Sequence, residues 1–218
     1  MKACRKAFTE TLLEIAKTDE KIWALATDSR GSVTLTDFAK ELPGQFVECG
    51  IAEQDAVGIA AGLTLEGRTA FVCGPASFYA TRSAEQVKVD VAYSHRDVKV
   101  IGVSGGVSYG ALGGTHHAVQ DIAFMRAVPG LQVLIPADAA QSAAMTKAIA
   151  YSGEPAYVRM GRGDVEDVYT EDCPFEIGKA NVLKTGSKAV IIACGEMVYP
   201  SLKAAELLSE KGVDVSVI

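Results

Sequence analysis

Residues 46–75, FVECGIAEQDAVGIAAGLTLEGRTAFVCGP, predict a strand, a helix and a second strand in succession. The apolar run at 46–50 is typical of a short strand, and residues 69–75 form another one, which Gly-Pro closes. Between them, residues 53–65 have the length and apolar character of a helix, and Gly67 stands where a helix stops. Because strands joined through a helix lie parallel in one sheet, this stretch predicts one unit of an α/β fold.

The same alternation continues on both sides of this unit. Further strands are predicted at 22–28, 98–106, 131–135 and 156–160, and further helices at 5–17, 81–94, 119–127 and 138–150. Apolar strands separated by helices are typical of a doubly wound, mainly parallel sheet that is covered on both faces. Such a sheet binds ligands at the carboxyl ends of its strands. The segments that follow the strands are therefore the first site candidates: 28–32, 50–53, 75–79, 104–117 and 159–164.

Composition divides the chain of 218 residues into three parts. We expect a domain over 1–163, a linker rich in acidic residues over 164–178, and the incomplete start of a second α/β domain over 179–218. The last part contains KAVIIACGEMV, a new strand–loop–helix unit, and ends in VDVSVI, a strand. About 40 residues are too few to bury a core of their own. We therefore expect either that the chain is a fragment or that a partner covers this part.

Charge and composition exclude several classes of function. The net charge is −6, so neither a nucleic acid nor a membrane surface is an expected partner. No apolar run could span a bilayer, and the charged start lacks the apolar block of a secretory signal, so we expect a cytoplasmic protein. The five cysteines are scattered without a CxxC pair, which predicts buried free thiols and neither a disulfide framework nor a zinc site.

Glu53 is the first candidate for chemistry. A carboxylate in the first turn of a helix is favoured by the helix dipole, so a purely structural role is one explanation. Its neighbours, among them Ile51, Ala52 and Ala56, offer few polar groups that could interact with the carboxylate. A carboxyl group kept away from water holds its proton to higher pH and can exchange a hydrogen bond with a heterocyclic nitrogen. Both roles remain open from the sequence.

A second candidate is the loop GVSYGALGGTHH at 106–117. Its glycines allow the backbone to approach a ligand closely, and histidine is the usual proton shuttle near neutral pH. His116 and His117 are adjacent and point in different directions, so at most one faces a given ligand, and both could instead lie on the loop surface. The loop contains no phosphate-binding GxxxxGK[ST] motif, and no GxGxxG motif opens a helix after a strand.

Aromatic and basic residues follow other strand ends. Phe78 and Tyr79 come after the Gly-Pro turn, where their rings could stack on a flat ligand or pack in the core. Arg159 and Arg162 flank a strand end, and Arg5 lies near the start of the chain. Arginines that converge on a cleft in an acidic protein indicate an anionic group such as phosphate, whereas a lone arginine is more often a surface ion pair.

Four stretches, in this order, resemble the transketolase-like enzymes that depend on thiamine diphosphate. ECGIAEQDAVGIAAGLTLEG resembles the glutamate motif of the family's pyrimidine-binding domain, and GGTHHAVQDIAFMRAVPGLQVLIPAD resembles its histidine loop and the following strand. RKAFTETLLEIA with ALATDSRGS resembles the start of that domain, and YVRMGRGD resembles its end. The resemblance covers about residues 3–163 and continues into the family's C-terminal domain.

The resemblance implies a cofactor site. Glu53 would hydrogen-bond the aminopyrimidine nitrogen of thiamine diphosphate and favour the tautomer that removes the proton from the thiazolium carbon. Phe78 and Tyr79 fall where the family packs aromatic rings around the pyrimidine, without a choice between them, and Asp28 matches an acidic residue near the cofactor.

The resemblance also implies a sugar phosphate substrate. His116 matches the histidine that touches substrate oxygens, and Arg5, Ser32 and Arg159 match positions that hold the sugar's phosphate. Two positions depart from the pattern of transketolases. Leu112 replaces an aspartate that contacts a substrate hydroxyl, and Ser104 replaces a second substrate histidine, which leaves the identity of the sugar open.

The family's GDG motif and its following asparagine, which hold Mg²⁺ and the diphosphate, have no counterpart in this chain. No metal ligand is therefore expected here. The resemblance implies the C-terminal half of a split transketolase, active with an N-terminal subunit that carries GDG, in a heterotetramer. Within the family, a deoxyxylulose-phosphate synthase and the beta subunit of a ketoacid dehydrogenase remain alternatives. A non-catalytic assembly subunit and a flavodoxin-like binding domain are alternatives of other classes.

Overall fold

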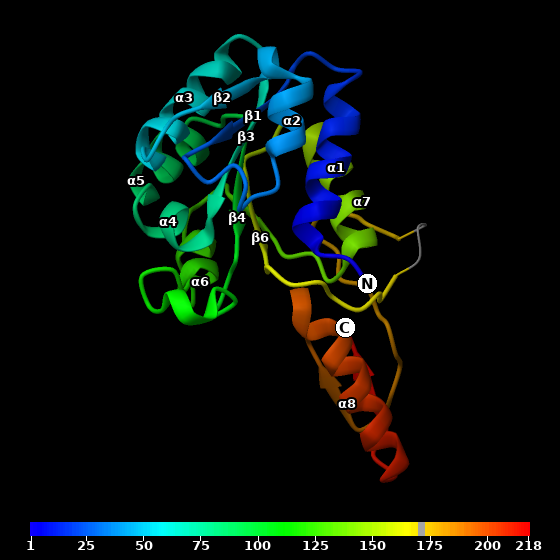
Figure 1. Ribbon diagram of the computed structural model, residues 1–218. Helices are drawn as coiled ribbons and strands as arrows, with labels where there is room; N and C mark the ends of the chain where they lie inside the picture. Colours follow the sequence, from blue (N-terminus) through cyan, green and yellow to red (C-terminus); the bar gives the residue numbers. More distant parts are fainter. Residues whose placement is uncertain (170–172) are drawn as a thin grey trace.

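The computed structural model describes residues 1–169 and 173–218, which form two units (Figure 1). The first unit is built on a six-stranded parallel sheet with strand order β2-β1-β3-β4-β6-β5. Its strands are β1 (Ile22–Ala26), β2 (Phe46–Glu48), β3 (Thr69–Pro75), β4 (Val98–Val103), β5 (Gln132–Leu134) and β6 (Ala156–Met160). This confirms the predicted α/β class with a mainly parallel sheet.

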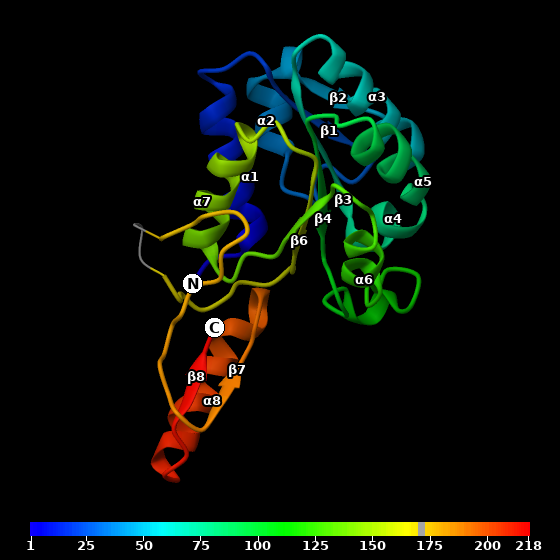
Figure 2. The same ribbon diagram turned by 180° about the vertical axis from the view of Figure 1, so that it is seen from behind.

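Helices cover both faces of the sheet, as Figure 2 shows from behind. One face carries α1 (Cys4–Ala16), α2 (Thr36–Glu41) and α7 (Ala139–Ala150). The other carries α3 (Glu53–Leu65), α4 (Ala76–Thr81), the short α5 (Ala84–Gln86), the π-helix η2 (Val87–Tyr93) and α6 (Asp121–Arg126). Two 3₁₀ turns, η1 (Pro43–Gln45) and η3 (Gly110–Leu112), complete the unit.

Successive side chains of each strand point to opposite faces of the sheet, and this divides the interior into two apolar cores. In β3, Phe71 and Cys73 pack with α1 and α7, while Ala70 and Val72 pack with α3. Because successive side chains of a strand point to opposite faces, a strand that is buried on both sides has a continuous apolar sequence. All seven residues of β3 are buried, in agreement with the predicted sheet that is covered on both faces.

The helix that begins at Glu53 has the predicted bounds, Glu53 to Leu65. Gly67 follows two residues after the end of the helix, and its φ of +72° lies in the left-handed region that glycine adopts readily. The N–H of Gly67 donates to the carbonyl of Thr64, and the N–H of Arg68 donates to that of Leu63, which satisfies the last carbonyls of the helix.

Three local features differ from the expectations. Residues 36–41 form a helix that the sequence did not announce, because six residues are too few to show a clear period. Residues 76–81, expected as a segment after a turn, form α4. The single helix predicted at 81–94 is divided into α5 and a π-helical stretch at 87–93.

The second unit consists of β7 (Ala189–Ile191), η4 (Gly195–Met197), α8 (Val198–Glu210) and β8 (Val215–Val217), and its two strands pair in parallel. The strand, helix and strand that the sequence predicted here are therefore present. Of the linker expected over 164–178, residues 170–172 lie outside the described residues. The boundaries 163 and 178 stay a prediction.

Candidate active site

Buried polar atoms without a hydrogen-bond partner mark one edge of the sheet. Among the described residues, five of seven such atoms are the hydroxyl oxygens of Ser29, Ser77 and Ser104 and nitrogen atoms of Arg159 and Arg162, and the other two belong to Gln86 and Gln132 elsewhere in the fold. The serines and arginines follow β1, β3 and β4 or lie at the end of β6, which are neighbouring parallel strands. Unsatisfied buried polar groups are costly, so their convergence at the carboxyl edge indicates that this edge binds a polar ligand.

Glu53 lies at this edge, at the first residue of α3, and its side chain is only 2% exposed. Its Oε2 is 2.5 Å from Nη1 of Arg82, the residue that follows α4. Glu53 is buried, as its apolar neighbours in the sequence suggested. The expectation that few polar groups surround it is wrong, because Arg82 contacts its carboxylate. The contact between Glu53 and Arg82 could not be predicted from a local sequence pattern, because the two residues are 29 positions apart.

The neighbouring aromatic residues occupy different environments. Tyr79 has no exposed surface, belongs to the core beneath α3, and places its hydroxyl 3.4 Å from Oγ1 of Thr27. Burial raises the pKa of the Tyr79 hydroxyl. Phe78 is partly exposed, and the guanidinium carbon of Arg82 lies 4.5 Å from its ring centroid. Of the two rings, Phe78 is the one that is open to a ligand.

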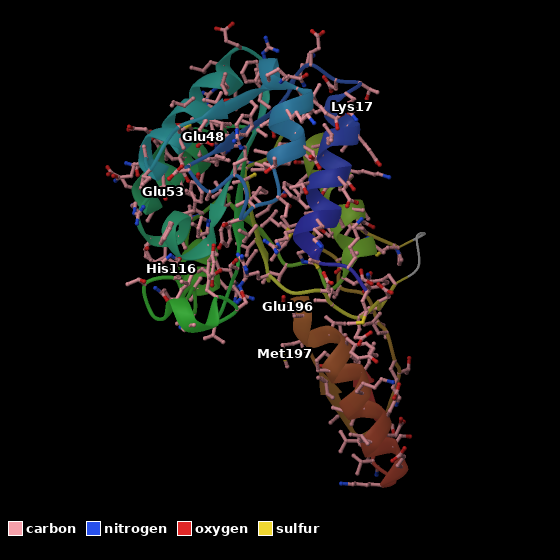
Figure 3. All side chains as sticks on the ribbon, in the orientation of Figure 1. Lys17, Glu48, Glu53, His116, Glu196 and Met197 are labelled. Carbon is pink, nitrogen blue, oxygen red and sulfur yellow. The ribbon has the colours of Figure 1, made fainter. Side chains whose placement is uncertain are left out.

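The histidine loop contacts the same ring. The rings of Phe78 and His116 have centroids 5.2 Å apart, and His116 lies equally far from the ring of Tyr109. Figure 3 shows Glu53 and His116 on the same side of the molecule. His117 turns to the loop itself, where its Nε2 is 3.1 Å from the carbonyl of Gly110. Only one of the two histidines therefore lies with the aromatic residues.

Tyr109 connects this group to the arginines. The guanidinium carbon of Arg162 lies 5.0 Å from the ring centroid of Tyr109. Arg5 donates from Nε to the carbonyl of Arg162 at 3.1 Å and from Nη1 to the carbonyl of Ser32. Burial, and then the charge of Arg162, lower the pKa of the Arg5 guanidinium. Two cations held this close favour an anion beside them.

Contacts thus run without a break along the site. They join Glu53, Arg82, Phe78, His116, Tyr109, Arg162, Arg5 and Ser32 in that order. The arrangement places a buried carboxylate and a half-exposed ring at one end and a cluster of guanidinium groups at the other. We call this set the site wall.

Arg159 is held beside the wall. Its Nε lies 3.2 Å from Oδ2 of Asp121, an ion-pair contact that lacks the alignment of a hydrogen bond. Asp121 is 1% exposed and also accepts a hydrogen bond of 2.9 Å from the hydroxyl of Tyr157. A Cβ placed at Gly105 would collide with the Arg159 side chain, so glycine allows this arginine to lie against the loop. Asp121 had not been singled out in the sequence, because Tyr157 stands 36 positions further along the chain.

The remaining residues singled out in the sequence make none of the contacts that join the wall. Asp28 follows β1 with a φ of +54°, and its N–H donates to Oε1 of Glu48 at 2.8 Å. Its own carboxylate is exposed. Leu112 is exposed in η3, and Ser104 is fully buried directly after β4 with a φ of +60°.

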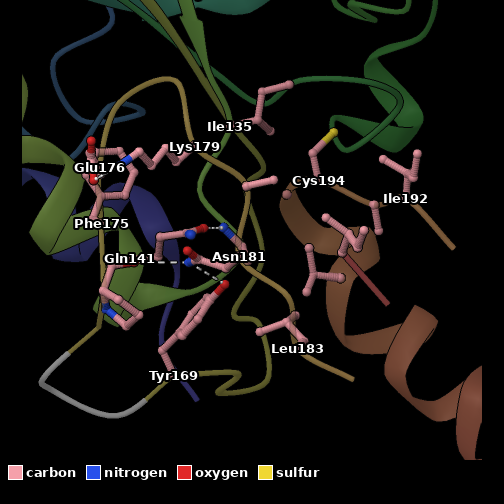
Figure 4. A pocket seen from close by; sticks show the side chains of 17 residues that line it. Ile135, Gln141, Tyr169, Phe175, Glu176, Lys179, Asn181, Leu183, Ile192 and Cys194 are labelled. Carbon is pink, nitrogen blue, oxygen red and sulfur yellow. Dashed lines mark hydrogen bonds and ion pairs between the residues drawn. The ribbon is translucent and has the colours of Figure 1, made fainter. Parts of the chain in front are cut away.

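Another pocket lies between the two units, away from these residues (Figure 4). Its lining includes Ile135, Gln141, Tyr169, Asn181 and Cys194. The Asn181 amide donates to the Tyr169 hydroxyl at 3.0 Å. None of the predicted site residues takes part in this pocket.

The cysteines differ in burial, and no metal cluster accompanies them in the described ranges. Cys4 and Cys73 are buried as expected, and burial raises the pKa of Cys4 to about 12. The expectation of a buried thiol is wrong for Cys194, which is exposed. Within residues 1–169 and 173–218, no group of three His, Cys, Asp or Glu side chains is placed to bind a metal ion. No helix in these ranges has the length and apolar character needed to cross a membrane, and the cytoplasmic location stays a prediction.

Comparisons with known proteins agree with this architecture. Residues 1–167 match the family model of the transketolase pyrimidine binding domain, and residues 178–218 match that of the transketolase C-terminal domain. The chain therefore belongs to the transketolase family, whose members depend on thiamine diphosphate.

Several of its relatives are named as subunits of transketolases or as split-gene transketolases. The chain is 58% identical to an apulose-4-phosphate transketolase subunit of Phocaeicola vulgatus over 100% of its own length and 70% of that protein. It is 35% identical to a 6-deoxy-6-sulfo-D-fructose transketolase subunit of Clostridium sp., over 98% of this chain and 66% of the relative. A solved split-gene transketolase, described as an inactive β4 tetramer, superposes with a TM-score of 0.91 at 37% identity, covering 100% of this chain and 70% of that one.

The residues present fit one end of thiamine diphosphate. The buried carboxylate of Glu53 and the open ring of Phe78 offer a hydrogen-bond partner and a stacking surface to a flat heterocycle. The described residues offer no comparable ligand set for a metal ion.

Proposed function

We propose that this chain is the pyrimidine-binding subunit of a thiamine-diphosphate-dependent transketolase that transfers a two-carbon ketol unit between sugar phosphates. The observation that carries the proposal is the placement of Glu53. Its carboxylate is almost fully buried, yet it lies at the carboxyl edge of the sheet, where the ring nitrogen of a ligand can reach it. The other residues of the site wall are arranged around it.

The first role of the chain is to hold and orient the cofactor's pyrimidine. Glu53 exchanges a hydrogen bond with the ring nitrogen, Phe78 packs against the ring, and the buried surroundings keep water from the carboxylate. Asp28 lies at the same edge of the sheet, after β1. When bound, thiamine diphosphate supplies the nucleophilic carbon and the electron sink for breaking and forming the carbon–carbon bond.

The second role is to bind the sugar phosphate. Arg5, Ser32 and Arg159 hold the phosphate, and Arg162 lies among them. His116 lies between this anion site and Phe78, at a position suited to touch the substrate's oxygens. Because the relative from Phocaeicola vulgatus is named for apulose 4-phosphate, we propose this sugar as the first donor to test.

The site is completed by a second polypeptide. We propose an N-terminal transketolase subunit that carries GDG and supplies the Mg²⁺ and diphosphate ligands, in a heterotetramer. Ile51 is exposed beside Glu53, Ile59 is exposed further along the same helix, and a Cβ added at Gly58 or Gly62 would meet no described atom. An open apolar face next to a buried catalytic group suits a subunit interface. The relative solved as a β4 tetramer is described as inactive.

The test is reconstitution with the N-terminal subunit, Mg²⁺ and thiamine diphosphate. We expect two-carbon transfer from apulose 4-phosphate or another ketose phosphate to an aldose phosphate, measured by product analysis. Glu53→Ala should lower kcat about 10²-fold or more, the scale of a positioned proton-transfer group. Asp37→Ala is the matched control, because Asp37 is an exposed carboxylate in the first turn of α2.

Each other outcome points to a different function. Oxidative decarboxylation of a 2-keto acid would replace the transketolase reaction with that of a ketoacid dehydrogenase. Condensation of pyruvate with a triose phosphate, with release of the pyruvate carboxyl group as CO2, would indicate a deoxyxylulose-phosphate synthase. Full activity of the Glu53→Ala complex would leave the chain as an assembly subunit.

A further inference from the structure

Arg82 is a residue of the site wall to which the proposed reaction assigns no role. It follows α4 directly, and its side chain is 44% exposed while that of its partner Glu53 is 2% exposed. Both residues line a small open pocket beside the start of α3, so the ion pair lies at the boundary between the core and the surface. A guanidinium in this position can bond to the buried carboxylate without being buried itself.

The ring of Phe78 fixes the place of the guanidinium. Phe78 and Arg82 are four residues apart at the end of one helix, so their side chains lie on the same face. The guanidinium carbon is 4.5 Å from the ring centroid, a distance at which a cation is attracted to an aromatic face. Arg82 is thus held from two sides, by the ring and by the carboxylate.

The contact with Arg82 determines which oxygen of the Glu53 carboxylate is open to a ligand. Burial disfavours a charged carboxylate, and a guanidinium at hydrogen-bond distance favours it. The bond to Arg82 occupies Oε2, and no hydrogen bond within the described residues occupies Oε1. The other ionisable groups nearby make no bond to Glu53: Asp55 is exposed on the same helix, and Tyr79 lies in the core. One oxygen is anchored and the other is free for a ligand.

We propose that Arg82 is a positioning residue for Glu53: its guanidinium holds Oε2 and balances the carboxylate charge, so that Oε1 faces the ring nitrogen of the cofactor. This inference rests on the proposed function. It assigns Arg82 no contact with the substrate. Phe78 then has two tasks, since the same ring supports both the guanidinium and the cofactor.

The test measures cofactor activation without substrate. In the reconstituted complex with Mg²⁺ and thiamine diphosphate, deuterium incorporation at the thiazolium carbon is followed by NMR after rapid quenching. Arg82→Met should slow this exchange about 10- to 100-fold, the usual effect of removing a partner that orients a functional ligand. The cofactor Kd and the sugar KM should stay close to those of the wild type. Arg82→Lys keeps the charge and should recover part of the rate.

Arg68→Met is the matched control. Arg68 also lies over an aromatic ring, 5.2 Å from that of Trp23, and donates to the carbonyl of Glu20, but it stands before β3 at the opposite edge of the sheet. In the complex with Arg68→Met, deuterium exchange at the thiazolium carbon should be as fast as in the wild-type complex. Thermal unfolding and sedimentation of each complex show whether it is folded and assembled.

The outcomes separate this inference from the proposed function. If Arg82→Met exchanges at the wild-type rate while Glu53→Ala is slow, Arg82 has no positioning role and the proposed function stands. If Arg82→Lys is as slow as Arg82→Met, the charge of Arg82 is not what presents Glu53, and the proposal is overturned. If Glu53→Ala exchanges at the wild-type rate, the proposed function itself fails.

Discussion

Glu53 shows how two opposing effects act on one residue. Its surroundings remove water, which disfavours a charged carboxylate, and Arg82 supplies a close cation that favours it. Loss of the half-exposed Arg82 would leave the buried carboxylate of Glu53 without this cation. A carboxylate held in this way is available to a ligand without being exposed to bulk solvent.

Arg5 provides a prediction on the substrate side. Because an anion would relieve the repulsion between Arg5 and Arg162, we expect Arg5 to bind the phosphate of the sugar. Arg5→Met should raise the KM for a phosphorylated donor about 10- to 100-fold, the range of a hydrogen bond to a charged group, with a smaller change in kcat. Steady-state kinetics of the reconstituted complex measure both.

Two further variants and a donor without phosphate control for the predicted effect of Arg5→Met on the KM. Arg5→Lys keeps the charge and should lie between the wild type and Arg5→Met, and Arg126→Met removes an exposed arginine of α6 and should change nothing. A donor without a phosphate should give the same KM with both Arg5 variants. An unaltered KM for the phosphorylated donor in Arg5→Met would remove Arg5 from the substrate site.

The candidate residues were predictable from sequence to different degrees. Glu53, His116 and Arg159 stand in short stretches whose residue types already indicate chemistry, and the structure places them along one edge of the sheet. Arg82 and Asp121 gave no such signal. Their partners are distant in the chain, and only the folded sheet brings each pair together.

At the scale of elements, the strands were the most predictable. Strands β1, β3, β4 and β6 are buried on both faces, so their sequences are mostly apolar, with Lys99 in β4 and Arg159 in β6 as charged exceptions. Of the short helices, α6 lies within the helix predicted at 119–127, whereas α2 and α4 were not predicted. Helix α4 follows β3 without a gap and has fewer than two turns of pattern. The irregular π-helical stretch packs against α3 and has no local signal of its own.

Asp138 supports a prediction about the elements. It is fully buried before α7, and its carboxylate accepts hydrogen bonds from the N–H groups of Gln141, Val168 and Tyr169 at 2.7–2.8 Å. One side chain thus caps the helix and anchors the chain that leaves β6. Asp138→Ala should lower the free energy of unfolding by about 2–4 kcal/mol, since it removes a helix cap and leaves two further N–H groups without a partner.

Urea denaturation followed by circular dichroism measures this loss. The exposed Asp37 lies in the first turn of α2 and serves as the control, and Asp37→Ala should change the stability by less than about 0.5 kcal/mol. Equal midpoints for the two variants would show that Asp138 does not anchor this segment.

At the scale of the whole molecule, the site wall adjoins the exposed apolar residues of α3, because Glu53 of the wall is the first residue of that helix. The wall offers groups for a heterocycle and for an anion, and the described residues offer no ligand set for the metal that would join them. The exposed apolar side chains beside Glu53 extend this incomplete site toward a second chain. The account therefore depends on a cofactor that is bound between two subunits and activated by Glu53.

Deuterium exchange at the thiazolium carbon of thiamine diphosphate tests that dependence most directly, because it needs no knowledge of the sugar. The exchange rate is measured with this chain alone, with the N-terminal subunit alone, with both, and with both when this chain carries Glu53→Ala. We predict rapid exchange only in the wild-type pair, and a fall of about 10²-fold or more with Glu53→Ala. Equally rapid exchange with either subunit alone, or in the Glu53→Ala pair, would contradict the account.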